Sequence, residues 1–198
     1  MTLAFGAALR AVATVLERLG IPWFVGGSVA SLVHGEIRTT QDVDVVVDLR
    51  PESVDELVAA LVGEFLVDGE FVRLAVRSGS SCNLVHRESG MKVDLFLLRR
   101  RAFSREEMRR RLPVPLQPGL VTNVATAEDC VLTKLEWFEK GGRVSERQWR
   151  DVQGIVRVQG QHLDLAYLRR WAGELGVGEV LERALRREGP PPPLQGPA

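Results

Sequence analysis

Two aspartates stand two residues apart in the segment of the chain that is most typical of a β-strand. Asp42 and Asp44 lie in the run DVDVVVDL (42–49), whose valines favour an extended backbone. Because side chains alternate between the faces of a strand, Asp42, Asp44 and Asp48 would share one face, with the first two Cα atoms about 6.6 Å apart. Such carboxylates repel each other unless a cation lies between them, and carboxylate oxygens bind hard cations. The pair therefore predicts a site for Mg²⁺ or Mn²⁺, whereas Asp48 is expected only to end the strand.

A third acid lies among apolar residues in a second strand-like segment, Lys92-Val93-Asp94-Leu95-Phe96. Neighbouring strands lie ~4.8 Å apart, so Asp94 would complete a cluster of three carboxylates if this segment pairs with 42–49. Two metal ions held by such a cluster can activate a hydroxyl and stabilise a leaving oxygen in phosphoryl-type transfer. The alternatives are a solvated strand face for Asp42 and Asp44, and a structural ion pair of Asp94 with Lys92 or an arginine.

A glycine pair lies where a short apolar strand (22–25) gives way to a short helix (29–34). Gly26 and Gly27 let backbone N–H groups approach a phosphate closely, and Ser28 adds a hydroxyl donor. Neither the eight-residue P-loop pattern nor GxGxxG occurs here. The specific feature is the combination, in which 13 residues separate Gly-Gly-Ser from Asp-Val-Asp within strand–helix–strand. It predicts that a phosphate site and a metal site are neighbours.

The whole segment GGSVASLVHGEIRTTQDVDVVVD (26–48) resembles the signature of the nucleotidyltransferase-fold superfamily, the polymerase-β-like enzymes. The resemblance implies an α/β (α+β) fold, in which a mixed sheet with flanking helices precedes a helical C-terminal domain. It implies transfer of a nucleoside monophosphate from a nucleoside triphosphate to an acceptor hydroxyl, with release of pyrophosphate. The residues to which it gives a role are Asp42, Asp44 and Asp94, as catalytic metal ligands, and Gly26, Gly27, Ser28, Arg38 and Thr40, as nucleotide-binding residues.

The C-terminal half resembles that of abortive-infection toxin nucleotidyltransferases and their uncharacterised relatives. One expected helix carries Lys134, one of three lysines in the chain, and the next carries Asp151 in Arg147-Gln148-Trp149-Arg150-Asp151. The resemblance implies that Lys134 contacts the triphosphate and that Asp151 orients it or the neighbouring helix. A solvated lysine and a structural pair of Asp151 with Arg147 are the alternatives. A toxin of this kind would act on RNA, such as a tRNA end, and would have a cognate antitoxin.

Three functions stay open: transfer to RNA, transfer to a small molecule or a protein, and a catalytically inactive nucleotide-binding or antitoxin-like module. The inactive module predicts loss of an acid or of the glycine pair, and all of them are present. The segment 99–111, with seven Arg and two Glu, supports an RNA partner. Its alternative is a solvated basic helix in which Glu106–Arg110 and Glu107–Arg111 have stabilising i,i+4 spacing.

Apolar residues at helical and strand spacings predict the other elements. The expected helices are 5–19, 29–34, 51–65, a short helix capped by Ser104, 126–139, 145–158, 163–175 and 178–187. The expected strands are 22–25, 42–49, 71–77, 82–87 and 91–98, the last three as a meander, with 113–118 a linker or an edge strand. We therefore expect a nucleotidyltransferase domain at 1–120, a helical domain at 121–188 and a disordered Pro-rich tail at 189–198.

The composition limits the class of protein. The 198 residues are 45% hydrophobic and 26% charged, which is typical of a globular chain, and the formal net charge of zero gives no general attraction to nucleic acid or membranes. Two cysteines are too few for a disulfide framework, and the three histidines lack zinc spacing. No apolar run approaches 18 residues, and the N-terminus lacks the features of a signal peptide. We expect a cytoplasmic protein without a membrane partner.

Overall fold

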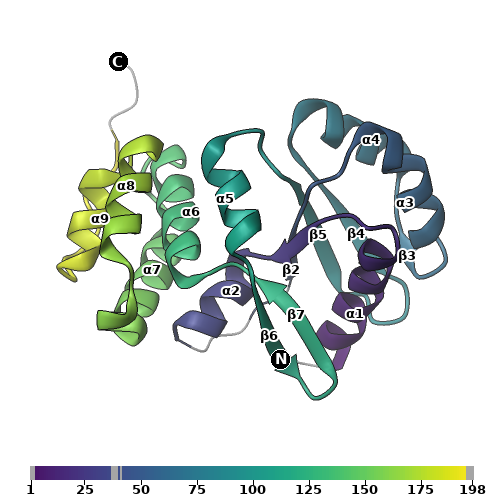
Figure 1. Cartoon of the computed structure of the whole chain (residues 1–198), viewed down its shortest axis with the longest axis horizontal. Coiled ribbons are helices and arrows are strands. Elements are labelled where there is room, and N and C mark those ends of the chain that lie inside the picture. Colours follow the sequence, from purple (N-terminus) through teal and green to yellow (C-terminus); the bar gives the residue numbers. More distant parts are fainter. Residues whose placement is uncertain (1–2, 37–39, 41, 195–198) are drawn as a thin grey trace. The chain divides into compact units, whose positions relative to one another are not determined.

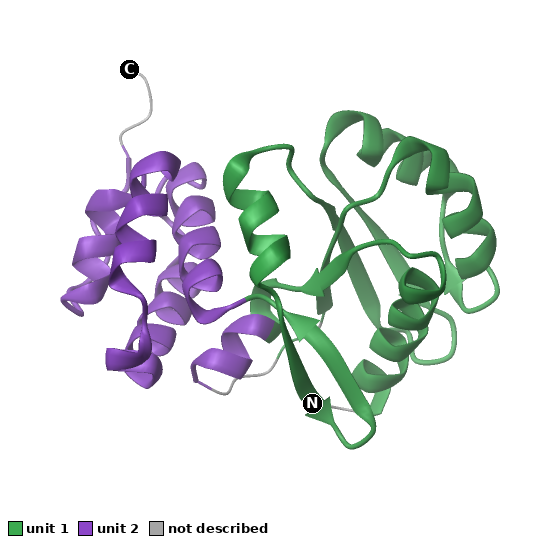
Figure 2. Cartoon of the chain, viewed as in Figure 1, with its two compact units in different colours: residues 1–29, 39–125 green, residues 30–38, 126–198 purple. Residues whose placement is uncertain are grey.

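The computed structural model describes residues 3–36, 40 and 42–194. The chain forms two compact units (Figure 2), the first made of residues 1–29 and 39–125 and the second of residues 30–38 and 126–198. The chain therefore enters the second unit for a short segment, returns to the first unit, and enters the second again after residue 125.

The first unit is built on a mixed sheet (Figure 1), in which seven strands are found among the described residues, in the order β3-β4-β5-β2-β1-β7-β6. The strands are β1 Trp23–Val25, β2 Asp42–Val47, β3 Phe65–Leu66, β4 Ser81–His86, β5 Lys92–Leu97, β6 Leu112–Gln117 and β7 Leu120–Val124. β2 runs parallel to β5 and antiparallel to β1, and β1 runs parallel to β7. The antiparallel pairs β3/β4 and β4/β5 form the meander, and β6/β7 form a hairpin at the other edge.

The two faces of this sheet differ in burial because the strand sequences alternate. In β2, Val43, Val45 and Val47 are fully buried, while the residues between them are half-buried. The same alternation holds in β5. Helix α1 (Leu3–Arg18) contacts β2, β5 and β7, and its apolar residues Leu9, Val12 and Leu16 are fully buried. The apolar alternation thus fixes one face against the core and leaves the aspartates of β2 on the other.

The remaining helices of the first unit connect these strands. They are the one-turn 3-10 helix η1 Pro51–Ser53, α3 Val54–Leu61, α4 Gly69–Ser78 and α5 Ala102–Arg110, and α2 Gly27–His34 starts in this unit. α3 contacts α1 and α4, and α4 contacts β4. The predicted α/β fold is confirmed.

Two local predictions in this unit are wrong. Residues 71–77 form most of α4 and are not a strand, because the Asp68 side chain caps the helix start and Gly79 (φ 63°) ends it. The meander therefore begins at the two-residue strand β3. Ser104 does not cap the next helix, since α5 begins at Ala102 and Ser104 is buried within it, with its Oγ accepting a hydrogen bond from Arg101 Nε.

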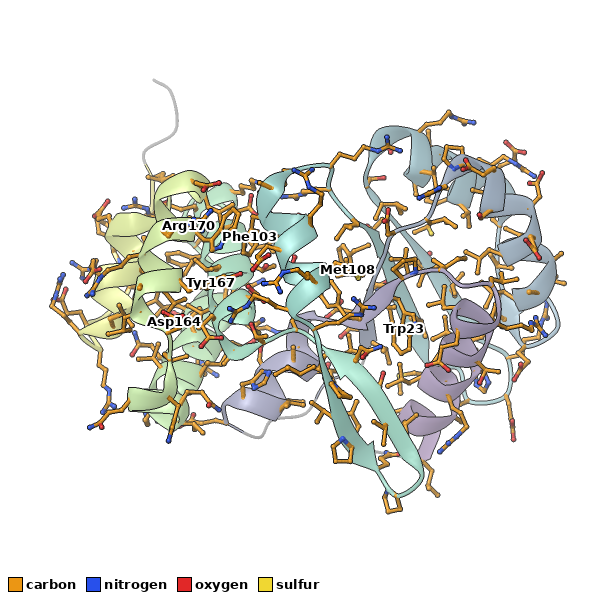
Figure 3. The ribbon with its side chains drawn as sticks, in the orientation of Figure 1. Trp23, Phe103, Met108, Asp164, Tyr167 and Arg170 are labelled. Atoms are coloured by element: carbon orange, nitrogen blue, oxygen red, sulfur yellow. The ribbon has the colours of Figure 1, made fainter. Side chains whose placement is uncertain are left out.

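The second unit is helical. It contains α6 Ala127–Lys140, α7 Glu146–Gln159, the 3-10 helix η2 Gly160–His162, α8 Leu165–Leu175 and α9 Gly178–Leu185. The predicted caps are confirmed, since Thr126 accepts from the Asp129 N–H and Ser145 from the Gln148 N–H. Asp164 caps α8 by accepting from the Tyr167 N–H (Figure 3), and the Tyr167 hydroxyl donates to the fully buried Asp129.

The C-terminal part of α2 belongs to this unit. Ser31 Oγ lies 3.4 Å from Cys130 Sγ, and the His34 carbonyl accepts from Gln159 Nε2. Gly35 packs so closely on Gly154 and Ile155 that a Cβ atom there would lie 3.0 Å from a backbone nitrogen. These contacts attach the segment 30–36 to α6 and α7.

The described part of the C-terminal segment, from residue 189 to 194, forms no regular element. Pro191 is buried, and the Leu194 N–H donates to the Gly142 carbonyl. Along the whole described chain, every helix is too short or too polar to cross a bilayer.

Candidate active site

The aspartates meet through the parallel pairing of β2 and β5. Asp44 lies directly across from Asp94 in this register, and Asp42 lies across from Lys92. All four residues are half-buried and share the open face of the sheet. On the other side of β5, Asn83 of β4 lies across from Asp94. The pairing of the two acid-bearing strands, on which the predicted cluster depends, is therefore present.

The turn between β1 and α2 is folded against Asp44. Gly27 has a φ of +51°, and a Cβ atom added to it would lie 1.8 Å from Asp44 Oδ2. The Ser28 N–H donates to the same Oδ2 over 3.1 Å, and the Gly26 N–H donates to the Asp44 carbonyl over 3.0 Å. A carboxylate is favourable at a helix N-terminus because the first N–H groups lack helical partners. The glycine pair and Asp44 thus form one local structure.

Asp42 and Asp94 have different neighbours. Thr40 Oγ1 donates to Asp42 Oδ1 over 3.1 Å. Lys92 Nζ lies 2.9 Å from Asp94 Oδ2, and the lysine side chain is 44% exposed against 16% for the aspartate. The alternative in which Asp94 pairs with Lys92 is therefore realised in this structure.

The negative charge of the cluster changes the titration of its neighbours. The hydrogen bond to Asp94 raises the pKa of the Lys92 ammonium, and the charges of Asp94, Asp42 and Asp44 act in the same direction against partial desolvation. Cys82 of β4 is buried beneath this face. Burial, with the charge of Asp94 as a second cause, raises the pKa of its thiol to about 11.

The donor set suits a hard cation in its chemistry, since three carboxylates share one face and one of them already binds an ammonium group. Their side chains do not yet converge. Within residues 3–36, 40 and 42–194, no three His, Cys, Asp or Glu side chains lie close enough together to hold a metal ion. Each carboxylate instead contacts a different neighbour. The three neighbours are Ser28 for Asp44, Thr40 for Asp42 and Lys92 for Asp94.

The other predicted site residues lie elsewhere. Lys134 and Asp151 belong to the second unit, where Lys134 Nζ lies 2.8 Å from Asp151 Oδ2 and donates to Gln148 Oε1 over 3.1 Å. Both side chains of this ion pair are buried. Arg38 lies outside the described residues. Asp48 follows β2 and is exposed, as expected for a residue that ends the strand.

The basic segment 99–111 contains α5. Arg109 pairs with Glu106 at i,i+3, and the Arg101 guanidinium lies 5.3 Å from the centre of the Phe103 ring. Phe103 and Met108 are the buried residues of this helix that Figure 3 labels. Arg100 and Arg105 are exposed. The segment is therefore a basic helix anchored by apolar residues, with part of its charge neutralised locally.

From the sequence, Lys92 is predicted only as a structural partner of Asp94, and Asn83 has no predicted role. The signal for Lys92 was its two-residue spacing from Asp94, which puts both on one face. Asn83 had no such signal, because its place beside Asp94 follows from the β4/β5 register.

No protein-family model matches the sequence, and no curated protein sequence is significantly similar to it. Solved structures do match the fold. One is an antigenic nucleotidyltransferase-like protein from Paracoccidioides brasiliensis, with a TM-score of 0.54, 16% identity and 92% of each chain covered. Another is the antibiotic-resistance factor ANT(2'')-Ia, with a TM-score of 0.56, 9% identity, and 95% of this chain and 100% of that chain covered. Both similarities extend over the sheet and the helical unit together. The chain therefore has the nucleotidyltransferase fold.

Proposed function

We propose that this protein is a metal-dependent nucleotidyltransferase, which moves a nucleoside monophosphate from a nucleoside triphosphate to an acceptor hydroxyl. The observation that carries the proposal is the register of Asp44 against Asp94, with the Gly26–Ser28 turn packed on Asp44. The Gly-Gly-Ser turn and the acids on neighbouring strands, which are the two elements of the sequence signature, thus lie in one local structure. The fold shared with a nucleotidyltransferase-like protein and with ANT(2'')-Ia supports the proposal.

In this proposal Asp42, Asp44 and Asp94 hold Mg²⁺ or Mn²⁺. The bound metal would neutralise charge on the triphosphate and stabilise the leaving pyrophosphate. To bind the metal, the carboxylates have to give up their present hydrogen bonds and ion pair. At Asp44 this change has a second effect. Because Asp44 Oδ2 accepts the Ser28 N–H, turning the carboxylate away frees the start of α2 for a phosphate oxygen.

The chain's own groups supply the remaining steps. The Gly26, Gly27 and Ser28 backbone and the Ser28 and Thr40 hydroxyls orient the β- and γ-phosphates. Asp94 accepts the proton of the acceptor hydroxyl, whose oxygen attacks the α-phosphorus in line as the bond to the β-phosphate oxygen breaks. Positioning and charge neutralisation give most of the rate enhancement in such a reaction.

For the acceptor, a small molecule is favoured by one observation. The match to ANT(2'')-Ia, an antibiotic-resistance factor, covers 95% of this chain and 100% of that chain. The two chains therefore share one architecture over nearly their whole length. RNA is the second candidate, supported by the exposed Arg100 and Arg105 of the basic segment. The toxin-like role, the antitoxin partner and nucleotide contacts by Arg38, Lys134 and Asp151 stay predictions.

Thermal unfolding with ATP, GTP, CTP and UTP, each with and without Mg²⁺, tests the proposal. A nucleotide at 100 times its dissociation constant adds ~2.7 kcal/mol to the free energy of unfolding, which raises the melting temperature by about 5–11 °C for a chain of this size. We expect a rise that requires Mg²⁺ for at least one nucleotide. The same nucleotide, labelled at the α-phosphate, should then label hydroxylated antibiotics or total tRNA.

The chain offers a matched control just beyond the end of the same strand. Asp42→Asn and Asp94→Asn should abolish the metal-dependent rise and the transfer of label, whereas Asp48→Asn should leave both unchanged, because Asp48 is exposed beyond the end of β2. Equal loss in all three variants, or no rise with any nucleotide in the native protein, would contradict the proposed function.

A further inference from the structure

Lys92 lies among the three aspartates of the candidate site. It is two residues from Asp94 in β5 and directly across from Asp42 in β2, so it shares their face of the sheet. Its ammonium nitrogen lies 2.9 Å from Asp94 Oδ2. The register thus puts Lys92 on the same face as all three aspartates, with Asp94 as its ion-pair partner.

The pair contributes little to the stability of the fold. The Lys92 side chain is 44% exposed, and pairs at that exposure are worth between zero and about 1 kcal/mol. Another lysine of the chain provides a comparison. Lys140 pairs with Glu136 one helical turn away in α6 and is 48% exposed. The two lysines are alike in exposure and in having a carboxylate partner, and they differ in that Lys92 faces further carboxylates.

The contact at Asp94 has a consequence for metal binding. Lys92 Nζ occupies part of the acceptor capacity of Asp94 Oδ2. A metal ion that binds Oδ2 at that position has to displace the ammonium group. A metal ion that binds Asp94 in another way lies beside a retained positive charge, which lowers the affinity of the face for any further cation.

We propose that Lys92 is a resident counterion of the acidic face, which competes with the metal ion for Asp94 and keeps metal affinity low until a nucleotide binds. The inference rests on the proposed function, because it assumes that Asp94 is a metal ligand. In the absence of nucleotide the ammonium group offsets the mutual repulsion of the aspartates. A triphosphate adds negative charge that favours the divalent ion over the monovalent lysine. Lys92 thus makes metal binding depend on nucleotide binding.

The test is the dissociation constant of Mn²⁺ in the absence of nucleotide, measured from the electron paramagnetic resonance signal of free Mn²⁺. Lys92→Met should bind Mn²⁺ about tenfold more tightly than the native protein, which corresponds to about 1.4 kcal/mol. Lys92→Arg, which keeps the charge, should bind like the native protein. The matched control is Lys140→Met, which removes a lysine of equal exposure from a single carboxylate and should not change Mn²⁺ affinity.

The site of the gain is checked with Lys92→Met/Asp94→Asn, which should lose it. An unchanged or weaker affinity in Lys92→Met, or an equal gain in Lys140→Met, would overturn the inference. The Mn²⁺ dissociation constant of Lys92→Arg tests the inference even if Lys92→Met fails to fold. Because arginine keeps the positive charge, a tenfold gain in Mn²⁺ affinity in this variant would refute the role of charge. Failure of the proposed function is seen separately, as absence of label transfer by the native protein at saturating Mg²⁺.

Discussion

At Gly27, the carboxylate of Asp44 occupies the space that a Cβ atom would take. The residue has a left-handed φ of +51°, and its missing Cβ atom leaves the room that Asp44 Oδ2 occupies. Gly20 has a similar φ of +64°, with nothing within 4 Å of a Cβ atom there. Both glycines have a left-handed backbone, but only Gly27 has a side chain, that of Asp44, close to the position of a Cβ atom. A comparison of the two therefore separates conformational strain from the function of the turn.

We expect Gly27→Ala and Gly20→Ala each to lower the free energy of unfolding by about 1–2 kcal/mol, because L-residues are strained in the left-handed region. Gly27→Ala should in addition abolish the nucleotide-dependent rise in melting temperature, since its methyl group displaces Asp44. Urea denaturation and thermal unfolding with Mg²⁺ and nucleotide measure the two effects. A retained nucleotide response in Gly27→Ala would show that the turn is not part of the binding site.

The Cys82 thiol gives a pH dependence of stability. Its pKa is raised in the folded protein from an ordinary 9.0 to about 11, chiefly by burial. The unfolded chain therefore releases the thiol proton first, so the free energy of unfolding is unaffected below pH 9 and falls between pH 9 and 11. The loss is at most about 3 kcal/mol. Urea denaturation at several pH values should show a smaller decline in Cys82→Ala, and parallel declines would be evidence against this cause.

At the scale of elements, α4 shows where local sequence preference misleads. The run Phe71-Val72-Arg73-Leu74-Ala75 contains residues that favour strands, and the predicted strand followed from that preference. The caps at either end decide otherwise, because Asp68 accepts from the N–H groups of Glu70 and Phe71, and Gly79 adopts the left-handed conformation that ends a helix. Val72 and Ala75, three residues apart, are the buried ones.

The contribution of the Asp68 cap can be measured against a cap position that lacks a side-chain bond. Asp68→Ala should lower the free energy of unfolding by about 1 kcal/mol, the usual value for removing a capping carboxylate. Ser53 occupies the same position before α3 and makes no capping hydrogen bond, so Ser53→Ala should change stability by much less. Urea denaturation of both variants tests this, and equal losses would mean that the cap does not fix α4.

Much of the site could be predicted from sequence because it rests on local patterns. The alternation of valine and aspartate gave the faces of β2 and β5, and the glycine pair gave the turn before α2. The pairing of Asp44 with Asp94 and the closeness of Gly27 to Asp44 depend on strand register, to which residues far apart in the chain contribute. The present partners of the carboxylates were not predictable, since they depend on side-chain positions.

At the scale of the whole molecule, each unit has its own core and its own tryptophan residues, whose fluorescence can report its unfolding. Three of the four tryptophans, Trp137, Trp149 and Trp171, belong to the second unit, and Trp23 belongs to the first. In the second unit Trp149 packs on Phe138, with 5.4 Å between ring centres. A Trp23→Phe background would therefore confine the tryptophan signal to the second unit.

In that background, Lys134→Met should destabilise the second unit by about 3 kcal/mol, because it leaves the Asp151 carboxylate buried without its ammonium partner. Lys134→Met/Asp151→Leu should recover part of the loss, since apolar replacement of both members of a buried pair is often nearly neutral. Urea unfolding followed by tryptophan fluorescence measures both. A loss below 1 kcal/mol in the single variant would mean that the Lys134–Asp151 pair does not stabilise the second unit.

The path of the chain through α2 sets an order of events during synthesis. The first residues of α2 belong to the first unit, and residues 30–38 belong to the second. Cys130, which contacts Ser31, is made 99 residues later, and Gln159 follows His34 by 125 residues. Ribosomes add about 5–20 residues per second, so the C-terminal part of α2 waits about 5–20 s for its first partner. A segment that is made before strands β2 to β7 is thus among the last to reach its final place.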